Sequence, residues 1–454
     1  MSHKLSWKKL LSASRVSGPR KDRTRSVDRS YVKADRRTNF EADYDRIVFS
    51  LPFRRLARKT QVHPMASNDH IHNRLIHSLE VASVGRSLSD RVVELAVKES
   101  DLSESAHLDL SWILQSACLI HDLGNPPFGH AGEEVVRAWV KEHLEEYFSP
   151  AEFEDDDQRT RCISDCLNFE GNAQGFRIAS RYDNPSAGYL RLTYATLSSA
   201  VKYPWLSTDD RTPKKMKHNV YTTEAEIFKE IADELELYNA QGDFCRHPLS
   251  FLTEAADDIC YRILDLEDAV EMGICKRNEV HKLFLAISNN KDNDWMSLPQ
   301  LRGQAIQSLI NEFWNVYEAD FDNIMNGERE EDLKASLDEN YRNLLREVNQ
   351  FYEDIFGHRK KIATELGAYH ILGRVLKSLF KTIQSIVASE NYEQIHFLSK
   401  RCIELTWGKE HVEQNLNNSY SWWVQQVMDY VSGMTDDYAM KVSGEIGGFS
   451  LDMK

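Results

Sequence analysis

The chain has 454 residues, 41% of them hydrophobic and 28% charged, and its formal net charge is −15. This composition is typical of a globular protein with a large core, and the acidic balance argues against a surface coated for nucleic acid. No apolar run approaches the roughly 20 residues that cross a bilayer, so we expect no membrane-spanning segment. The seven cysteines include no CxxC pair, which predicts no disulfide framework and favours a reducing cytoplasm.

Residues 1–37 form a basic N-terminal arm that is rich in lysine and arginine and poor in acids. No apolar stretch of about 7–15 residues follows its first lysines, so the arm lacks the pattern of a secretory signal. Most arms of this kind are solvated tails. The functional alternative is that the arm contacts phosphate, either of a nucleotide or of DNA.

The rest of the chain predicts an all-α fold, because apolar residues recur at three- and four-residue spacing over long segments. The clearest helical segments lie within residues 76–92, 113–120, 251–266 and 372–386, and no period-2 series predicts a strand. We expect a multi-helix core over residues 38–285 and a helical C-terminal region over residues 286–454 that packs on it.

Three stretches are expected to interrupt the helices. Two adjacent prolines flanked by glycines between Gly124 and Gly129 cannot continue a helix. The acidic residues 152–157 predict a surface loop, and residues 182–222 predict a largely irregular segment.

Four residues are candidates for a metal site: His77, His121, Asp122 and Asp257. Two imidazoles and two carboxylates suit Mn²⁺, Mg²⁺, Fe²⁺ or Co²⁺ with positions left for water and a phosphate oxygen. His121 and Asp122 point about 100° apart on a helix and converge on one ion most easily near a helix end. A chance His-Asp pair is the alternative, but this pair follows an apolar run in which an unpaired charge is costly.

His130 and Glu133 follow the proline break and share one helix face, because they are three residues apart. They are candidates for a protonatable group and the carboxylate that orients it, and the alternative is a surface contact within one helix.

A polar stripe marks the helix around residue 257. Asp257, Tyr261 and Asp265 are spaced by four residues, and Asp258 and Arg262 have the same spacing. The second pair predicts a structural ion pair, so Asp257 is preferred over Asp258 as the ligand.

The order His77, His121-Asp122, Asp257 resembles the H…HD…D signature of the HD-domain phosphohydrolases. The flanking sequences are more specific and resemble the dGTPase branch of that superfamily. They are FRRL at 53–56, KTQV at 59–62, NRLIHSLEV at 73–81, HDLGNPPFGH at 121–130, NFEGNAQG at 168–175, EAADDI at 254–259 and DYVSGMTD at 429–436. The matches run in order from about residue 35 to 440.

The resemblance implies an HD-domain helical core around a divalent metal ion, Mn²⁺ or Mg²⁺, with Fe²⁺ or Co²⁺ as further options. It also implies hydrolysis of dGTP or another dNTP at the α-phosphorus, giving a deoxynucleoside and intact tripolyphosphate. Family members are commonly hexamers or tetramers, so a homo-oligomer is expected, and the base preference stays open.

The resemblance also assigns roles to individual residues. His77, His121, Asp122 and Asp257 would hold the metal, and His130, oriented by Glu133, would act on the attacking water or on the leaving group. The substrate residues would be Gln61 at the sugar 3′-OH, Tyr261 at the deoxyribose, Asp265 on the 3′ side, Lys202, Tyr203 and Lys217 at the triphosphate, Asn172 in support, and Arg54 with a less defined role. Basic residues between positions 202 and 217 are expected to gather around the triphosphate, including Arg211, Lys214 and Lys215.

Two other functions stay open at this point. The chain resembles HD phosphohydrolases broadly enough to act as a 5′-nucleotidase on monophosphates. It is also a candidate for a nucleotide-regulated protein that binds single-stranded DNA, because its basic arm and nine tryptophans would permit backbone contacts and stacking.

Overall fold

The computed structural model describes residues 4–16, 36–62, 71–99, 102, 106–181, 190–289 and 294–448. Most of the predicted basic arm, residues 17–35, lies outside these ranges, so its role stays a prediction.

The described residues form α-helices joined by turns and short 3-10 helices, and they contain no strand beyond four isolated β-bridges. The first half contains α1 (Trp7–Leu10), α2 (Asn39–Val48), α3 (Leu51–Arg55), α4 (Arg74–Glu99), α5 (Ala106–Ile120), α6 (His130–Glu142), α7 (Leu144–Tyr147), α8 (Asp156–Leu167), α9 (Gly171–Ser180), α10 (Tyr194–Ser199), α11 (Thr212–Lys215) and α12 (Ala225–Leu235). The second half contains α13 (Pro248–Glu271), α14 (Arg277–Ile287), α15 (Leu298–Ala319), α16 (Phe321–Met325), α17 (Glu339–Gly357), α18 (Arg359–Val387), α19 (Phe397–Leu405), α20 (Lys409–Asn415), α21 (Tyr420–Ser432) and α22 (Asp436–Ile446). The predicted all-α fold is confirmed.

Many helices begin at a side chain that caps the first turn. Thr38, Asp155 and Thr435 each accept a backbone N–H near the start of α2, α8 and α22. Such caps satisfy amide groups that have no partner within the helix. At α13 the same role falls to His247, and Pro248 follows it in the first turn, where proline loses no helical hydrogen bond.

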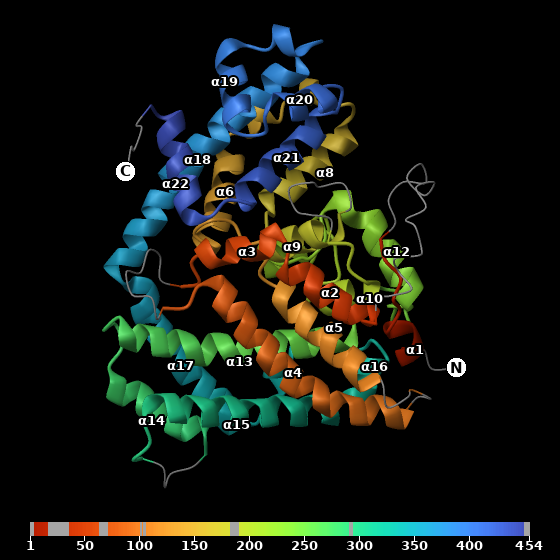
Figure 1. Ribbon diagram of the computed structural model, residues 1–454, viewed down its shortest axis with the longest axis vertical. Coiled ribbons are helices and arrows are strands. Elements are labelled where there is room, and N and C mark those ends of the chain that lie inside the picture. Colours follow the sequence, from red (N-terminus) through yellow and green to blue (C-terminus); the bar gives the residue numbers. More distant parts are fainter. Residues whose placement is uncertain are drawn as a thin grey trace.

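The lower part of the molecule in Figure 1 is built around α4, α5 and α13, which pack against one another. α2 covers α5, and α15 packs on both α13 and α4. Their buried side chains belong to one continuous hydrophobic core that extends along the chain from Leu5 to Ile355.

A second hydrophobic core fills the upper part of the molecule. α18, a helix of 29 residues, runs from the lower part to the top in Figure 1 and packs on α6, α19, α21 and α22. This core contains a cluster of aromatic rings: Trp139, Tyr147 and Phe148 all lie within 5.6 Å of the Phe380 ring, measured between centroids. The chain from α5 to α6 passes from the first core to the second, so residues 121–129 lie where the two cores meet.

A buried ion network joins α9 to α21. Arg177 donates from Nε and Nη2 to the two carboxylate oxygens of Asp429 at 2.8 and 2.9 Å and also pairs with Glu224. The Asp429 carboxylate accepts a third bond from Gln174 at 2.8 Å. Removing one partner of such a network leaves an uncompensated buried charge.

Three expectations need correction. α5 ends at Ile120, so His121 and Asp122 lie in the turn after the helix rather than in its last turn. The acidic stretch 152–157 is only partly a loop, because Asp155 caps α8 and the helix begins at Asp156. Residues 190–222 include α10 and α11; α10 is buried on all faces, so it shows no amphipathic pattern in the sequence.

Two expectations from composition concern the cysteines and membrane-spanning segments. All seven cysteines are free thiols, and six of them are buried. Among the described residues, no helix combines the length and the apolar character that a membrane crossing requires.

We predict that Asp429→Ala destabilises the fold by about 3–5 kcal/mol, because Arg177 would lose one of its two buried carboxylate partners. Urea denaturation followed by circular dichroism measures the loss. The control is Glu445→Ala, which removes a surface pair with Lys441 and should change the stability by less than about 0.5 kcal/mol. Equal effects of the two variants would contradict the prediction.

Candidate active site

Three side chains converge as a candidate metal centre at the junction of α4, α5 and α13. His77 lies in the first turn of α4, His121 follows the end of α5, and Asp257 lies in the middle of α13. One ligand atom from each lies within 4.8 Å of the other two. The imidazole Nε2 of His77 lies 3.2 Å from Oδ1 of Asp257. These donor atoms come from residues 180 positions apart in the chain, so only the packing of the first core brings them together.

The ring of His121 is oriented for binding a cation. Its Nδ1–H donates to the carbonyl oxygen of Cys118 at 2.6 Å, which leaves the lone pair of Nε2 directed at the cluster in the neutral ring. This buried Nε2 has no hydrogen-bond partner among the described residues. An unpartnered buried nitrogen beside Asp257, 3.5 Å away, fits a divalent metal ion held by nitrogen and oxygen donors.

Asp122 lies beside this cluster and is fixed by two neighbours. Its Oδ2 accepts from Arg74 at 2.7 Å, and its Oδ1 accepts from Asn125 at 2.6 Å and lies 3.5 Å from Nε2 of His121. Burial raises the pKa of Asp122, but the charges of Arg74, His121 and His77 together hold the pKa well below its usual range. The carboxylate therefore stays ionised next to the three converging ligands.

The charges around the ring of His121 have a net negative effect at that ring. Burial alone lowers the pKa of His121, yet the carboxylates of Asp122 and Asp257 raise it above its ordinary value. Lys202 is the counter-charge of Asp257, since its Nζ lies 2.8 Å from Oδ2 of that carboxylate. A site with this potential attracts cations, and a divalent ion would neutralise it.

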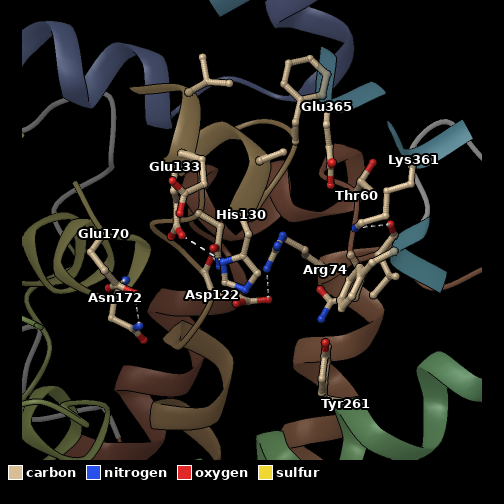
Figure 2. A pocket seen from close by; sticks show the side chains of 18 of the residues that line it. Thr60, Arg74, Asp122, His130, Glu133, Glu170, Asn172, Tyr261, Lys361 and Glu365 are labelled. Atoms are coloured by element: carbon tan, nitrogen blue, oxygen red, sulfur yellow. Dashed lines mark hydrogen bonds and ion pairs between the residues drawn. The ribbon is translucent and has the colours of Figure 1, made fainter. Parts of the chain in front are cut away.

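The centre lies at the bottom of a cavity of about 810 Å³ whose walls come from both cores. Figure 2 shows His130 and Glu133 on one side, Thr60, Lys361 and Glu365 on another, and Tyr261 rising from α13. The acidic residues of the lining are Asp122, Glu133, Glu134, Glu170, Asp257, Asp258 and Glu365, and the basic ones are Arg74, Lys202, Lys217 and Lys361. With seven acidic and four basic residues, the walls carry a negative excess that would repel a polyanion without added cations.

His130 and Glu133 form an imidazole–carboxylate pair at the wall of the cavity. The side chain of His130 is 78% exposed, and its Nδ1 lies 3.0 Å from Oε2 of Glu133. Glu133 is buried, and its Oε1 accepts the Gly171 N–H at 2.8 Å. Burial raises the pKa of Glu133, but the bond with His130 and the charge of Lys217 lower it to about 2. The ionised Glu133 thus orients the ring and leaves its Nε2 open to the cavity.

Glu170 organises a second polar group in the cavity wall. It caps α9 through the backbone N–H of Asn172 at 2.6 Å, and its Oε1 accepts from the Asn172 side chain at 2.9 Å and from Lys217 at 2.6 Å. Asn172 and Lys217, two predicted substrate residues, are therefore held by the buried carboxylate of Glu170, for which the sequence predicted no role.

Tyr261 is the first ring of an aromatic stack along the cavity. Its ring lies parallel to Tyr352, 4.9 Å between centroids, and Tyr352 stacks in turn on Phe356 at 5.4 Å. The Tyr352 hydroxyl donates to Oδ2 of Asp265 at 3.1 Å. Asp265 is buried behind the stack and does not line the cavity; burial raises its pKa well above the usual value.

The other predicted substrate residues divide into two groups. Gln61 and Tyr203 line the cavity, and the Oε1 atom of Gln61 is buried without a hydrogen-bond partner among the described residues. Arg54 is exposed on α3 and lies outside the lining.

The expected basic cluster is split. Lys202 and Lys217 line the cavity, whereas Lys214 and Lys215 are exposed and Arg211 binds Asp209 at 2.8 Å. The left-handed residue Met216, with φ 52°, ends α11 and reverses the chain between these groups. Sequence proximity alone did not reveal this turn.

Several lining residues were not identified from the sequence. Lys361, Glu365 and Tyr369 share one face of α18, about a hundred residues beyond the last recognised ligand. Their four-residue spacing is the only pattern in the sequence that could have indicated this shared face, and surface helices in general show the same spacing. Asp258 does form its predicted ion pair with Arg262, at 3.3 Å.

Comparisons with known proteins give one consistent result. A "Deoxyguanosinetriphosphate triphosphohydrolase-like protein" of Pseudomonas aeruginosa (strain LESB58) is 38% identical over 435 residues, covering 91% of this chain and 94% of the relative. A protein of the same name from Synechocystis sp. is 34% identical and covers 91% and 95%. A "Deoxyguanosinetriphosphate triphosphohydrolase" of Klebsiella pneumoniae (strain 342) is 28% identical and covers 92% and 95%. No family model matches the chain.

We predict that His121→Gln lowers the affinity for Mn²⁺ by about 100-fold or more. Loss of a residue that only hydrogen-bonds to a metal ligand already lowers metal affinity by about 10–100-fold, and loss of the ligand itself should cost at least as much. Titration calorimetry of the metal-stripped protein measures this affinity. His130→Gln is the matched control: it makes the same change in the same cavity and should retain the affinity. Loss of Mn²⁺ binding in both variants, or in neither, would rule out the assignment of His121.

Proposed function

The chain belongs to the deoxyguanosinetriphosphate triphosphohydrolase family and is a hydrolase, and from this premise we propose that it cleaves dGTP or a related dNTP with a divalent metal ion. The products would be the deoxynucleoside and inorganic tripolyphosphate. The observation that carries the proposal is the unpartnered Nε2 of His121 beside His77 and Asp257, at the bottom of a cavity large enough for a nucleotide.

The excess of acidic residues in the cavity supports dependence on a metal. His77, His121, Asp122 and Asp257 would hold the ion in an HD-domain core, within the proposed core region 38–285. Mn²⁺ or Mg²⁺ would polarise the phosphate and lower the pKa of a water molecule when bound. Fe²⁺ or Co²⁺ would suit the same donors.

The chain's own groups account for the proton transfers. Water would attack the α-phosphorus, and the bond from that phosphorus to O5′ would break. The water gives up one proton, and O5′ gains one as the deoxynucleoside leaves. His130 is the group placed for such a transfer, because Glu133 holds its Nδ1–H and its Nε2 faces the cavity. The ionised carboxylate of Glu133 would stabilise the imidazolium form.

Cations at one side of the centre would receive the triphosphate. Lys202 and Lys217 are now paired with Asp257 and Glu170, and Tyr203 and Asn172 lie near them in the lining. For both lysines burial lowers the pKa, but the paired carboxylates raise it above the usual value. Both stay charged, as binding of a polyanion requires.

The sugar would lie between Gln61 and Tyr261. Gln61 has a buried acceptor without a partner among the described residues, which suits a ribose 3′-hydroxyl donor. Tyr261 is held rigidly by its stack on Tyr352 and would exclude a 2′-hydroxyl. Asp265 binds Tyr352, so in this arrangement it would support the stack rather than touch the sugar directly.

The other expectations concern surfaces outside the cavity. We propose a homo-oligomer, since Phe49, Leu51, Ile76 and Leu79 are exposed apolar side chains on or beside α2, α3 and α4. Arg54 follows Leu51 by three residues on the same short helix, α3. Because Arg54 lies outside the lining of the cavity, it would contact a substrate only in the cavity of a partner subunit. The cytoplasmic location, the C-terminal region 286–454 and binding of single-stranded DNA by the basic arm stay predictions.

We predict that dGTP incubated with the protein and Mn²⁺ yields deoxyguanosine and tripolyphosphate in equal amounts, and that a chelator or His121→Ala abolishes both. Product chromatography with each dNTP and with dGMP makes the measurement. Hydrolysis of dGMP without tripolyphosphate from any dNTP would instead indicate the 5′-nucleotidase, and turnover only in dNTP mixtures would indicate an activating nucleotide.

We predict that Tyr261→Ala reduces the preference for dGTP over GTP by about 10–100-fold in kcat/KM, because the ring no longer blocks the 2′-hydroxyl. Tyr369→Ala is the control, since this ring lines the cavity from α18. An unchanged ratio of the two kcat/KM values in Tyr261→Ala would remove the ring from sugar selection.

A further inference from the structure

The buried carboxylate of Asp436 connects two segments that line the active-site cavity. Its Oδ2 accepts the backbone N–H of Thr60 at 3.1 Å and also the Thr60 hydroxyl. Its Oδ1 accepts the backbone N–H of Phe128 at 3.0 Å. Asp436 itself is 4% exposed and is not part of the lining. It therefore acts on the cavity through its bonds to these two segments.

Lys59 makes a second connection between the same regions. Its Nζ donates to the carbonyl oxygens of Asn125 at 2.5 Å and Ser432 at 2.7 Å, and the residue is 3% exposed. Burial lowers the pKa of this amine to about 7. Burying the amine costs free energy, and its two hydrogen bonds to carbonyl oxygens offset that cost. Ser432 ends α21, four residues before Asp436.

The connected segments carry the proposed chemistry. Residues 59–62 include Gln61, and residues 122–130 run from Asp122 to His130. The backbone of Lys59 and Thr60 also pairs with the start of α4: the Lys59 carbonyl accepts the Arg74 N–H at 3.2 Å. Residues 432–436, between α21 and α22, thus contact the segment that precedes His77 and the segment that follows His121.

The turn before His130 has a backbone that needs such support. Phe128 has φ 66° and Gly129 has φ 59°. A bulky side chain at positive φ costs of order 1–3 kcal/mol and persists only when neighbouring groups hold it. The bond from Phe128 N–H to Asp436 is made at the strained residue itself, two positions before His130.

A role as a simple helix cap does not explain Asp436. Thr435 is the cap of α22, and its hydroxyl accepts the Tyr438 N–H at 3.2 Å. The neighbouring Asp437 has the same charge at the same helix start, but it is exposed and only pairs with Arg58 at 3.5 Å. Asp436 differs in that its carboxylate is turned into the junction of the two site segments.

We propose that Asp436, assisted by Lys59, is a positioning residue that holds the His130 turn and the Gln61 segment in the arrangement used for catalysis. The catalytic part of this inference rests on the proposed function, whereas the structural part does not.

Hydrogen exchange tests the structural part without any substrate. In Asp436→Asn the amide group turns an N–H toward one of the two backbone donors, so at least one bond is lost. Exchange of at least one of the two peptides covering residues 56–62 and 123–130 is expected to accelerate by about ten-fold. A peptide within α13 should keep its protection. Asp437→Asn, with the same change of charge at the adjacent residue, should leave all three peptides unchanged.

Kinetics test the catalytic part. In Asp436→Asn the kcat for dGTP is expected to fall by about 100-fold, as for other small misplacements of reacting groups, while the calorimetric Mn²⁺ affinity is retained. In a His130→Ala background the same substitution should cost about ten-fold or less, because one of the two groups that it positions is gone. Additive losses would show that Asp436 does not act through His130 and would overturn the proposal.

The remaining outcomes are equally decisive. Unchanged exchange in Asp436→Asn overturns the structural part, and faster exchange with unchanged kcat overturns the catalytic part. If the wild-type protein does not turn over any dNTP, the proposed function fails, and the exchange data alone decide whether Asp436 holds the two segments. If Asp436→Asn does not fold, Thr60→Val replaces it: loss of one hydroxyl bond should accelerate exchange in residues 56–62 only.

Discussion

The burial of negative charge at the junction of two helical cores is the constraint on which the rest of this structure depends. Asp122 and Asp257 are ionised beside two histidines, and only Arg74 and Lys202 directly offset them. Buried carboxylates are costly unless they are paired, so the fold has to supply cations, hydrogen-bond donors or a metal ion at this point. A divalent ion bound at this point would add positive charge beside these two carboxylates.

The site also explains why the chain folds as two connected cores. Its ligands come from the first core, whereas His130 begins α6, whose apolar face packs into the second. The walls of the cavity are completed by α18, which contacts both parts of the molecule (Figure 1). Contacts between distant segments, such as Arg177 with Asp429 and Thr60 with Asp436, hold the two parts of the molecule together at the site. The geometry of the candidate site therefore depends on contacts between residues hundreds of positions apart.

Much of this arrangement was predictable, and the errors have specific causes. The long amphipathic helices could be recognised because each buries one face, as in α18, where Leu372, Leu379 and Ile386 are buried and some residues between them are exposed. The buried α10 was missed because a helix that is covered on all sides has no periodic pattern. Lys214 and Lys215 were grouped with Lys217 on sequence proximity, but a left-handed turn at Met216 directs them to solvent. Asp265 was expected at the sugar, yet it bonds to Tyr352 of α17, a helix that no motif linked to the site.

The helical class, the interruption between Gly124 and Gly129 and the residue types proposed for a metal centre could all be predicted from the sequence, since they follow from local periodicity, proline geometry and a motif. Only the tertiary structure decided that Nε2 of His121 is left without a partner, that Glu170 holds Asn172 and Lys217 together, and that Asp436 reaches the His130 turn. Those facts depend on which side chains meet across the two cores, and local spacing along the chain carries no information about such distances.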